Sequence, residues 1–281
     1  MSEPFSLLLP VYHRDDPGFL RRAFDSAVVE QERPPAEVVL VKDGPLGADL
    51  QAVVDEVRGS SPVPVVLVDL PRNIGLGRAL NAGLVACHHE LVARMDADDV
   101  SVPERFAVQV PVLEGGADLV GSALVEFDHD EDDVFGVRTP PLTEPEIVSW
   151  ARFHQPFNHP TVVYRRAAVL AAGGYQDLPL LEDYWLFARM IHAGARVANV
   201  AEPLVRYRVG AGAYHRRGGT QLLRSEVELQ RRLHALGFTT RAQYARNLAV
   251  RGGYRLVPQE VRRRAYRRFI AGRGERPSPV V

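Results

Sequence analysis

The sequence contains one cysteine and no long apolar run, and each absence excludes a class of protein. The single Cys87 excludes an intrachain disulfide and any metal site built from several thiolates. No segment reaches the roughly 20 consecutive apolar residues that a membrane-spanning helix needs. Residues 1–4 are acidic rather than basic, and the apolar run 5–11 fits a strand rather than a signal peptide. We therefore expect a soluble, cytoplasmic protein with one large domain, or one domain with additions.

Charge is distributed unevenly along the chain, although the net charge is only −1. Residues 1–215 carry 18 Arg and Lys against 31 Asp and Glu, whereas residues 216–281 carry 16 Arg against 4 Glu. A basic C-terminal segment of this kind either meets an anionic partner or docks on the acidic remainder of the chain. The sequence leaves both alternatives open.

The first third of the chain alternates strand-like and helix-like segments. We expect strands at 5–11, 38–41, 65–70 and 91–95, with helices at 17–29, 46–57 and 77–86 between them. Strands separated by helices predict an α/β fold with a mostly parallel sheet, and such sheets bind ligands beyond the carboxyl ends of their strands. Polar residues follow these strands at Tyr12, Asp43, Arg72-Asn73 and Asp96–Asp99. We therefore expect them to meet at one edge of the sheet.

Later segments have a less regular pattern. A capping-box pattern at Ser101 and Glu104 predicts a helix at 102–113. Further on we expect strands at 118–127, 161–164, 197–200 and 204–209, a helix at 181–193 and a solvated acidic loop at 128–133. The last sixty-five residues are predicted to be helical and basic, with a disordered tail at 273–281.

Three carboxylates, Asp96, Asp98 and Asp99, lie in the segment Arg94–Asp99, which directly follows the apolar residues 91–93. Such close carboxylates repel one another, so at the end of a buried strand they need a counter-cation. An Asp-x-Asp pair suits a hard divalent cation that keeps water and phosphate as its other ligands. An EF-hand is excluded, because position 100 is Val and no Gly follows at the required step. The alternative is a solvated acidic turn.

Five motifs, in this order, resemble those of glycosyltransferase family 2. They are Leu9-Pro10-Val11-Tyr12, Val41-Lys42-Asp43-Gly44, the segment 72–81, Met95–Asp99 and Leu181-Glu182-Asp183. The resemblance covers roughly residues 4–210, and the segment 207–219 further resembles amylovoran-type exopolysaccharide glycosyltransferases. It implies a GT-A fold, which is Rossmann-like with a mostly parallel sheet flanked by helices.

The resemblance also implies a division of the chain. Residues 1–215 would form the GT-A domain, with a nucleotide-sugar-binding half at 1–114 and an acceptor-side half at 115–215. Residues 216–281 would form a basic helical extension.

On the donor side, the resemblance implies that Pro10, Tyr12 and Asp43 hold the nucleotide base. Tyr12 would stack on the ring and Asp43 would accept an N–H, although an aspartate before Gly44 is also an ordinary turn former. The loop from Asn73 to Gly77 would let the backbone approach the nucleotide, with the helix that Gly77 opens favouring phosphate. Arg78 would contact the donor as well, and the alternative is that Arg78 and Asn81 form an ordinary surface pair.

The acidic motif would then hold Mg²⁺ or Mn²⁺. The resemblance implies that Asp98 ligates the metal, that Asp96 contacts the ribose or a metal-bound water, and that Asp99 supports Asp98. The metal would neutralise the leaving nucleoside diphosphate.

On the acceptor side, Asp183 is the candidate general base. It lies at the end of the core-facing stripe of the predicted helix, where burial raises a carboxyl pKa. The alternative is a helix-terminal acid stabilised by the dipole. Glu182 would orient the acceptor or bind an arginine, and His159 would be either an acceptor contact or structural. Many relatives carry a histidine two residues after a Tyr-Arg pair; here the position is Gly210, and His215 or Arg216-Arg217 could replace it.

These features predict inverting transfer of a sugar from a nucleotide-sugar, with UDP-sugar favoured, to a hydroxyl of a glycan or lipid-linked acceptor. The product would belong to exopolysaccharide or cell-surface polysaccharide. One alternative is a nucleotidyltransferase, which would need a glycine-rich basic loop where this chain has 10–13; another is a non-catalytic nucleotide-sugar or glycan-binding module.

The segment 258–270 is predicted to be an amphipathic, arginine-rich helix. Such a helix suits peripheral contact with the inner face of a membrane, and docking on the acidic half is the alternative. We expect no nucleic-acid partner.

Overall fold

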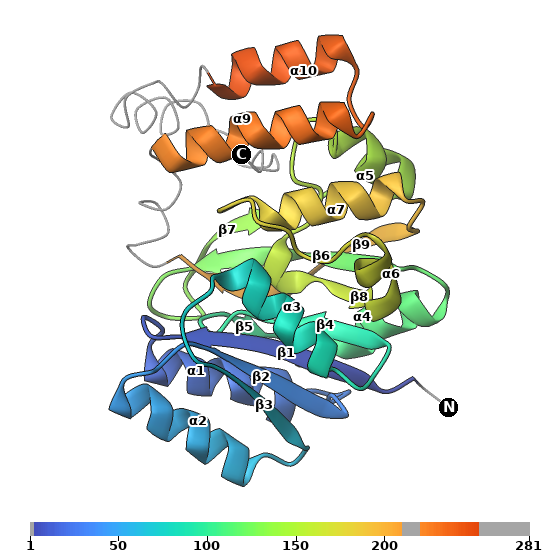
Figure 1. Cartoon of the computed structure of the whole chain (residues 1–281). Helices are drawn as coiled ribbons and strands as arrows, with labels where there is room; N and C mark the ends of the chain where they lie inside the picture. Colours follow the sequence, from blue (N-terminus) through green and yellow to red (C-terminus); the bar gives the residue numbers. More distant parts are fainter. Residues whose placement is uncertain (1–2, 210–219, 253–281) are drawn as a thin grey trace.

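The computed structural model describes residues 3–209 and 220–252, and a nine-stranded mixed sheet runs through the centre of the part it describes (Figure 1). Its strand order is β3-β2-β1-β4-β8-β6-β9-β5, with β7 paired to β6. The strands are β1 (Phe5–Tyr12), β2 (Glu37–Asp43), β3 (Val65–Leu70), β4 (Leu91–Arg94), β5 (Val100–Ser101), β6 (Leu119–Phe127), β7 (Val134–Arg138), β8 (Val163–Arg165) and β9 (Val197–Arg208). The first four strands are parallel, whereas β8 is antiparallel to both β4 and β6. The predicted α/β class is confirmed.

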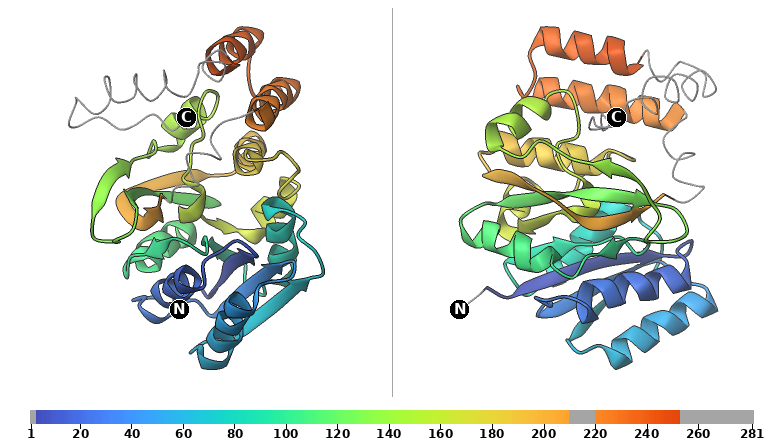
Figure 2. Two further views of the ribbon diagram at one scale, coloured as in Figure 1. Left: turned by 90° about the vertical axis from the view of Figure 1, so that its left-hand side faces the viewer. Right: turned by 180° about the vertical axis from the view of Figure 1, so that it is seen from behind.

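Helices cover both faces of this sheet (Figures 1 and 2). One face carries α1 (Pro17–Phe24), α2 (Ala48–Ser60) and α4 (Arg105–Glu114), and the other carries α3 (Leu76–Ala86), α5 (Glu144–Trp150), α6 (Arg166–Ala171) and α7 (Glu182–His192). A π-helical turn at Asp25–Val29 extends α1, and a 3₁₀ turn at His159–Thr161 precedes β8. Strands covered on both sides read as continuous apolar runs, which is why 5–11 lacks alternation.

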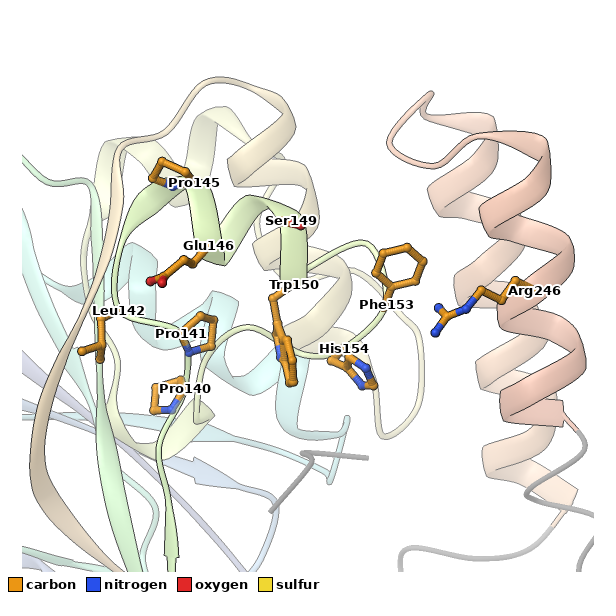
Figure 3. A pocket seen from close by; sticks show the side chains of 10 residues that line it. All are labelled: Pro140, Pro141, Leu142, Pro145, Glu146, Ser149, Trp150, Phe153, His154 and Arg246. Atoms are coloured by element: carbon orange, nitrogen blue, oxygen red, sulfur yellow. The ribbon is translucent and has the colours of Figure 1, made fainter. Parts of the chain in front are cut away.

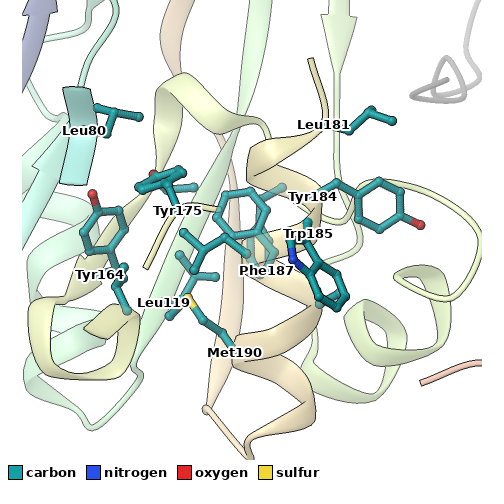
Figure 4. Packing of buried hydrophobic residues seen from close by; sticks show 14 of the residues in the cluster. Leu80, Leu119, Tyr164, Tyr175, Leu181, Tyr184, Trp185, Phe187 and Met190 are labelled. Carbon is teal, nitrogen blue, oxygen red and sulfur yellow. The ribbon is translucent and has the colours of Figure 1, made fainter. Parts of the chain in front are cut away.

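Two apolar clusters form the core, one on each face of the sheet. In β1, Leu8 belongs to the cluster under α3 and α7, whereas Leu7 and Leu9 belong to the cluster under α1 and α2. Figure 4 shows Phe187 and Met190 of α7 beside Leu119 of β6. Because α7 is fixed by this packing, the residues at its first turn are held in place.

The described part of the basic extension packs on α7. It consists of α9 (Thr220–Ala235), α10 (Arg241–Asn247) and a π-helical turn at Leu248–Gly252, and Figure 2 shows α9 between α7 and α10. Leu222, Leu229 and Leu233 of α9 join the α7 cluster. The proposed boundary at 215/216, the segment 258–270 and the tail 273–281 lie outside the described residues, so the domain division stays a prediction.

Two sequence expectations about secondary structure are wrong, and some elements were not predicted. Ser101 does not cap a helix: it lies in β5, its hydroxyl accepts from Arg105 Nη1 at 2.9 Å, and α4 begins only at Arg105. The strands expected at 197–200 and 204–209 form one strand, β9, whose register with β6 shifts near Ala123. The elements β7, α5 and α6 were not predicted from the sequence. None of the described helices has the length and apolar character needed to cross a bilayer.

The acidic loop at 128–133 is confirmed as a loop, but arginines from the body hold part of it. Arg22 pairs with Glu131 at 2.9 Å, and Arg206 pairs with Asp132 at 2.6 Å.

Candidate active site

The polar residues that follow the first strands meet at one edge of the sheet, as the sequence predicts. Tyr12 pairs with Asp43 in the parallel register of β1 and β2, and β4 lies on the other side of β1. The loop 71–75 continues from β3 beside them. The carboxyl ends of β1 to β4 therefore form one polar edge.

Asp43 organises the loop that follows β3. Its buried carboxylate accepts from the backbone N–H of Ile74 at 2.7 Å and of Gly75 at 3.1 Å. Gly44 has φ +89°, and a Cβ there would lie 2.5 Å from the backbone nitrogen of Asn73. The turn after β2 thus supports the loop 73–75 directly. Contact of Pro10, Tyr12, Asp43 and Asn73 with a nucleotide base stays a prediction.

The start of α3 lies against the start of α7. A Cβ on Gly77 would be 3.4 Å from Cγ of Glu182 and 3.4 Å from Cβ of Tyr175. Asn81 exchanges two hydrogen bonds with the backbone of Tyr175, at 2.8 and 2.6 Å. Arg78 pairs with Asp177, and both of these side chains are exposed. The amide-rich end of α3 and the candidate base are therefore neighbours.

The acidic motif forms a compact cluster of oxygen ligands. Asp96, Asp98 and Asp99 each offer a carboxylate oxygen, and these oxygens lie within 4.8 Å of one another. Asp99 is buried; its Oδ1 accepts from the Arg208 N–H at 2.9 Å, and its Oδ2 has no hydrogen-bond partner among the described residues. Burial raises the pKa of Asp99 well above its usual range, and Asp98 raises it further. A hard divalent cation would satisfy this orphaned oxygen, so the residues fit the predicted Mg²⁺ or Mn²⁺.

Arg94 compensates part of the charge of this cluster. It is 1% exposed, and its guanidinium forms a two-point ion pair with Asp96, with Nη1 2.6 Å from Oδ2. Asp96 is thus already engaged within the protein. A bidentate guanidinium–carboxylate pair also fixes the direction of the Asp96 side chain.

Two further arginines position the site, and sequence reasoning missed both. Arg105 is fully buried and donates from Nη2 to the carbonyls of Arg94 at 2.7 Å and Pro160 at 2.9 Å. Arg208 lies over the ring of Phe19 at 3.9 Å and donates from Nε to the Asp98 carbonyl at 3.0 Å. Arg208 was noted only as part of the Tyr-Arg pair and Arg105 not at all, because several of their partners are backbone carbonyls distant in sequence.

Asp183 lies at the first turn of α7 and is largely buried. Its Oδ1 accepts from the Tyr184 N–H at 2.7 Å, and its Oδ2 accepts from the side-chain amide of Gln155. Burial raises the pKa of Asp183, against the lowering effect of the Tyr184 N–H and then of Gln155. Burial, followed by the charge of Asp183, raises the pKa of Glu182 to about 7. This environment suits a carboxylate that accepts a proton.

His159 lies beside Asp183 in the interior. Its Nδ1 is 3.7 Å from Asp183 Oδ2, and its Nε2 is 2.9 Å from the hydroxyl of Tyr175. Burial, followed by the charge of Arg94, lowers the pKa of His159 well below its usual value, so the imidazole is neutral. The structure thus gives His159 partners around Asp183, and its contact with an acceptor stays a prediction. Gly210, His215 and Arg216 lie outside the described residues.

Comparison with known proteins decides the family. A family model described as glycosyl transferase family 2 matches residues 6–173, which is more than half of the chain. This chain belongs to glycosyl transferase family 2. The glycosyltransferase is 37% identical over 270 residues to the amylovoran biosynthesis glycosyltransferase AmsE of Erwinia amylovora, covering 95% of this chain and 100% of that one.

Two other relatives extend over nearly the whole glycosyltransferase. An uncharacterized glycosyltransferase of Haemophilus influenzae is 38% identical over 268 residues, covering 95% of this chain and 98% of its own length. The UDP-Gal:alpha-D-GlcNAc-diphosphoundecaprenol beta-1,3-galactosyltransferase of Escherichia coli is 30% identical over 268 residues, covering 95% of this chain and 96% of its own length.

Solved structures confirm the GT-A fold of this glycosyltransferase. S. aureus TarS 1-349 in complex with UDP has a TM-score of 0.64 at 17% identity, covering 96% of this chain and 74% of that one. The mannosyltransferase PcManGT from Pyrobaculum calidifontis, in complex with GDP-Man and Mn²⁺, has a TM-score of 0.64 at 18% identity, covering 96% and 82%.

Proposed function

We propose that this glycosyltransferase performs inverting, metal-dependent transfer of a hexose from a nucleotide-sugar to a hydroxyl of a lipid-linked saccharide, in polysaccharide synthesis. One observation carries the proposal. The carboxylate cluster of Asp96, Asp98 and Asp99 and the largely buried Asp183, which has no arginine paired with it among the described residues, are both influenced by the charge of Arg94, and Glu182 beside Asp183 lies against the start of α3.

Different residues of the chain bind the metal and the donor. Asp98 would hold Mg²⁺ or Mn²⁺ with the support of Asp99, and Asp96, fixed by Arg94, would contact the ribose or a metal-bound water. When bound, the metal neutralises the diphosphate that leaves with the nucleoside. The loop from Asn73 to Gly77 and the start of α3 face the donor phosphates, and Arg78 lies on the next turn.

Asp183 acts on the acceptor. It takes the proton of the acceptor hydroxyl, whose oxygen forms a bond to the anomeric carbon as the bond from that carbon to the diphosphate oxygen breaks. Attack from the face opposite the leaving group inverts the anomeric configuration, through an oxocarbenium-like state of the kind known from glycoside hydrolysis. Gln155 and His159 keep the carboxylate in place, and Glu182 orients the acceptor.

The relatives support the choice of donor and acceptor. The E. coli relative is named for a UDP-galactose donor and a diphosphoundecaprenol acceptor, and TarS has been solved with UDP-GlcNAc. We therefore favour a UDP-hexose and a lipid-linked acceptor at the cytoplasmic face of a membrane. The nucleotidyltransferase alternative is disfavoured, because β1 ends at Tyr12 and leads into α1 without a glycine-rich loop.

Release of nucleoside diphosphate from a panel of nucleotide-sugars, with and without Mn²⁺, tests the proposal. We expect turnover with a UDP-hexose that depends on Mn²⁺ and is lost in Asp183→Asn. Turnover that is equal in EDTA would contradict the metal assignment. Donor binding without any turnover across donors and lipid-linked acceptors would favour the binding-module alternative.

The basic end of the chain gives a second proposal about location. The segment 258–270 would lie on an anionic membrane, where each cation contributes about 1 kcal/mol. Co-sedimentation of the full chain with anionic liposomes, compared with residues 1–257, tests this. Equal binding by both proteins, or binding by neither, would favour a tail that docks on the protein itself.

A further inference from the structure

A pocket of about 710 Å³ lies between α5, the segment 140–142 and α10 (Figure 3). Its volume is within the range of about 300–1,000 Å³ that is usual for small-ligand sites. Pro141, Leu142 and Trp150 form apolar walls, and Phe153 and Arg246 lie at the end nearest α10. The nucleotide-sugar site uses none of these residues.

Arg246 is the charged group of the pocket that is available to a ligand. Its guanidinium lies 4.5 Å from the centre of the Phe153 ring, and no carboxylate of the described residues lies within ion-pair distance of it. The acid of the pocket, Glu146, is already engaged: its Oε2 accepts from the N–H and the hydroxyl of Thr143 in the capping box of α5. The pocket therefore presents apolar walls, the positive charge of Arg246 at the α10 end and the hydrogen-bonded carboxylate of Glu146 at the other end (Figure 3).

The pocket is joined to the candidate base by two consecutive residues. The ring of His154 packs on Trp150 with centroids 4.4 Å apart, and the next residue, Gln155, donates to Asp183. Consecutive Cα atoms are 3.8 Å apart. The loop that lines the pocket therefore continues directly into the side chain that bonds to Asp183.

We propose that this pocket binds the polyprenyl-diphosphate end of the acceptor, with the isoprenoid chain along Pro141, Leu142 and Trp150 and the diphosphate at Arg246. The assignment rests on the proposed function for its biological ligand. Charge favours an anionic amphiphile, because residues 220–252 carry six Arg against two Glu.

The test uses the full-length chain with farnesyl diphosphate as the probe, in EDTA and saturating UDP so that the donor site does not compete. The chain has two tryptophans, and Trp185→Phe leaves Trp150 as the reporter in the pocket. We expect a saturable change in Trp150 fluorescence. Inorganic diphosphate and farnesol should each bind about tenfold more weakly than farnesyl diphosphate, because the first lacks the isoprenoid chain and the second lacks the diphosphate. Calorimetry of the unmodified protein with farnesyl diphosphate provides the same measurement should Trp185→Phe fail to fold.

Arg246→Gln should weaken farnesyl diphosphate about tenfold and leave farnesol unchanged. Arg241→Gln is the matched control, since Arg241 is exposed on the same helix outside the pocket. Equal weakening by both variants would show general surface attraction and overturn the proposal. No response to farnesyl diphosphate, or a response to methyl glycosides instead, would also overturn it.

Binding of UDP and Mn²⁺, measured in the same variants, separates this assignment from the proposed function. Normal UDP binding without farnesyl diphosphate binding would contradict the proposed pocket ligand and leave the proposed transferase function standing. Farnesyl diphosphate binding in a protein that transfers no sugar would support the proposed pocket ligand and contradict the proposed transferase function.

Discussion

Two groups of carboxylates lie at the same end of the molecule, and their surroundings differ. The strand-end cluster of Asp96, Asp98 and Asp99 has the guanidinium of Arg94 against it and an orphaned oxygen on Asp99. The helix-start pair of Glu182 and Asp183 has an amide, a backbone N–H and a neutral imidazole nearby. The strand-end cluster carries negative charge that Arg94 balances only in part, so it favours a further cation. The helix-start pair holds a carboxylate whose proton affinity is raised.

Arg94 acts on both groups. Burial dominates the pKa of Asp99, Glu182 and Asp183, and against it the charge of Arg94 lowers all three. A single buried cation thus limits how far burial can raise these values. Residue type alone therefore does not assign a role to a carboxylate. Its neighbours decide whether it is suited to bind a metal ion or to accept a proton.

The largest expected effect comes from removing the proton acceptor. Asp183→Asn keeps the shape of the side chain but cannot accept a proton, so transfer should fall by about 10²–10⁴-fold while UDP binding is kept. Glu182→Gln is the matched control and should lose far less. Transfer in Asp183→Asn within about threefold of the unmodified enzyme would move the base elsewhere.

The second largest effect, on stability, is expected from removing Arg94, the cation that acts on both carboxylate groups. Arg94→Met leaves Asp96 without its buried partner and should lower the free energy of unfolding by about 3 kcal/mol, measured by urea denaturation. Arg78→Met removes the exposed pair with Asp177 and should leave the unfolding midpoint nearly unchanged. Equal effects would contradict the buried role of Arg94.

Asp98→Ala tests the strand-end cluster. The affinity for UDP in the presence of Mn²⁺ should fall about 100-fold, whereas the unfolding midpoint should stay within error, because the carboxylate serves an ion rather than the core. Calorimetry measures the UDP affinity with and without Mn²⁺, and urea denaturation measures the unfolding midpoint. Unchanged Mn²⁺-dependent affinity would remove Asp98 from the metal site.

Glu182 should make stability depend on pH. Its pKa is about 7 in the folded protein, against an ordinary value of 4.5, so the folded state holds a proton that the unfolded state has lost between these values. Stability should therefore fall as pH rises from 4.5 to 7. Urea denaturation of Glu182→Gln should show a flatter profile over this window. An identical slope in both proteins would contradict the raised pKa.

The smallest expected effect concerns Gln155. Its amide is one of the groups that lower the pKa of Asp183 against burial, so Gln155→Ala should move the acid limb of the transfer profile to higher pH. Activity at alkaline pH should be largely recovered, which loss of structure alone would not produce. An unshifted limb would show that Gln155 has no influence on the base.

Sequence reasoning reached most of the first half of the fold. The limits of β3, which Pro64 and Pro71 bound, agree with the prediction at both ends, and those of β1, α3 and β4 agree within one residue. It failed at Ser101, where a capping pattern lies inside a short strand, and at β7, whose exposed Val134 and Phe135 have no core face. In both places tertiary pairing overrode the local pattern.

By itself, the sequence determined the order of strands and helices, and from this the edge where Tyr12, Asp43 and the acidic motif meet. Parallel strands joined by helices leave little choice about where their carboxyl ends lie. Only the tertiary structure decided which charges are compensated. The bond of Gln155 to Asp183, the contacts of Arg105 with Pro160 and of Arg208 with Asp98, and the pocket under Arg246 all join residues far apart in the chain. Electrostatic energy depends on distance and burial, and neither can be read from spacing along the sequence.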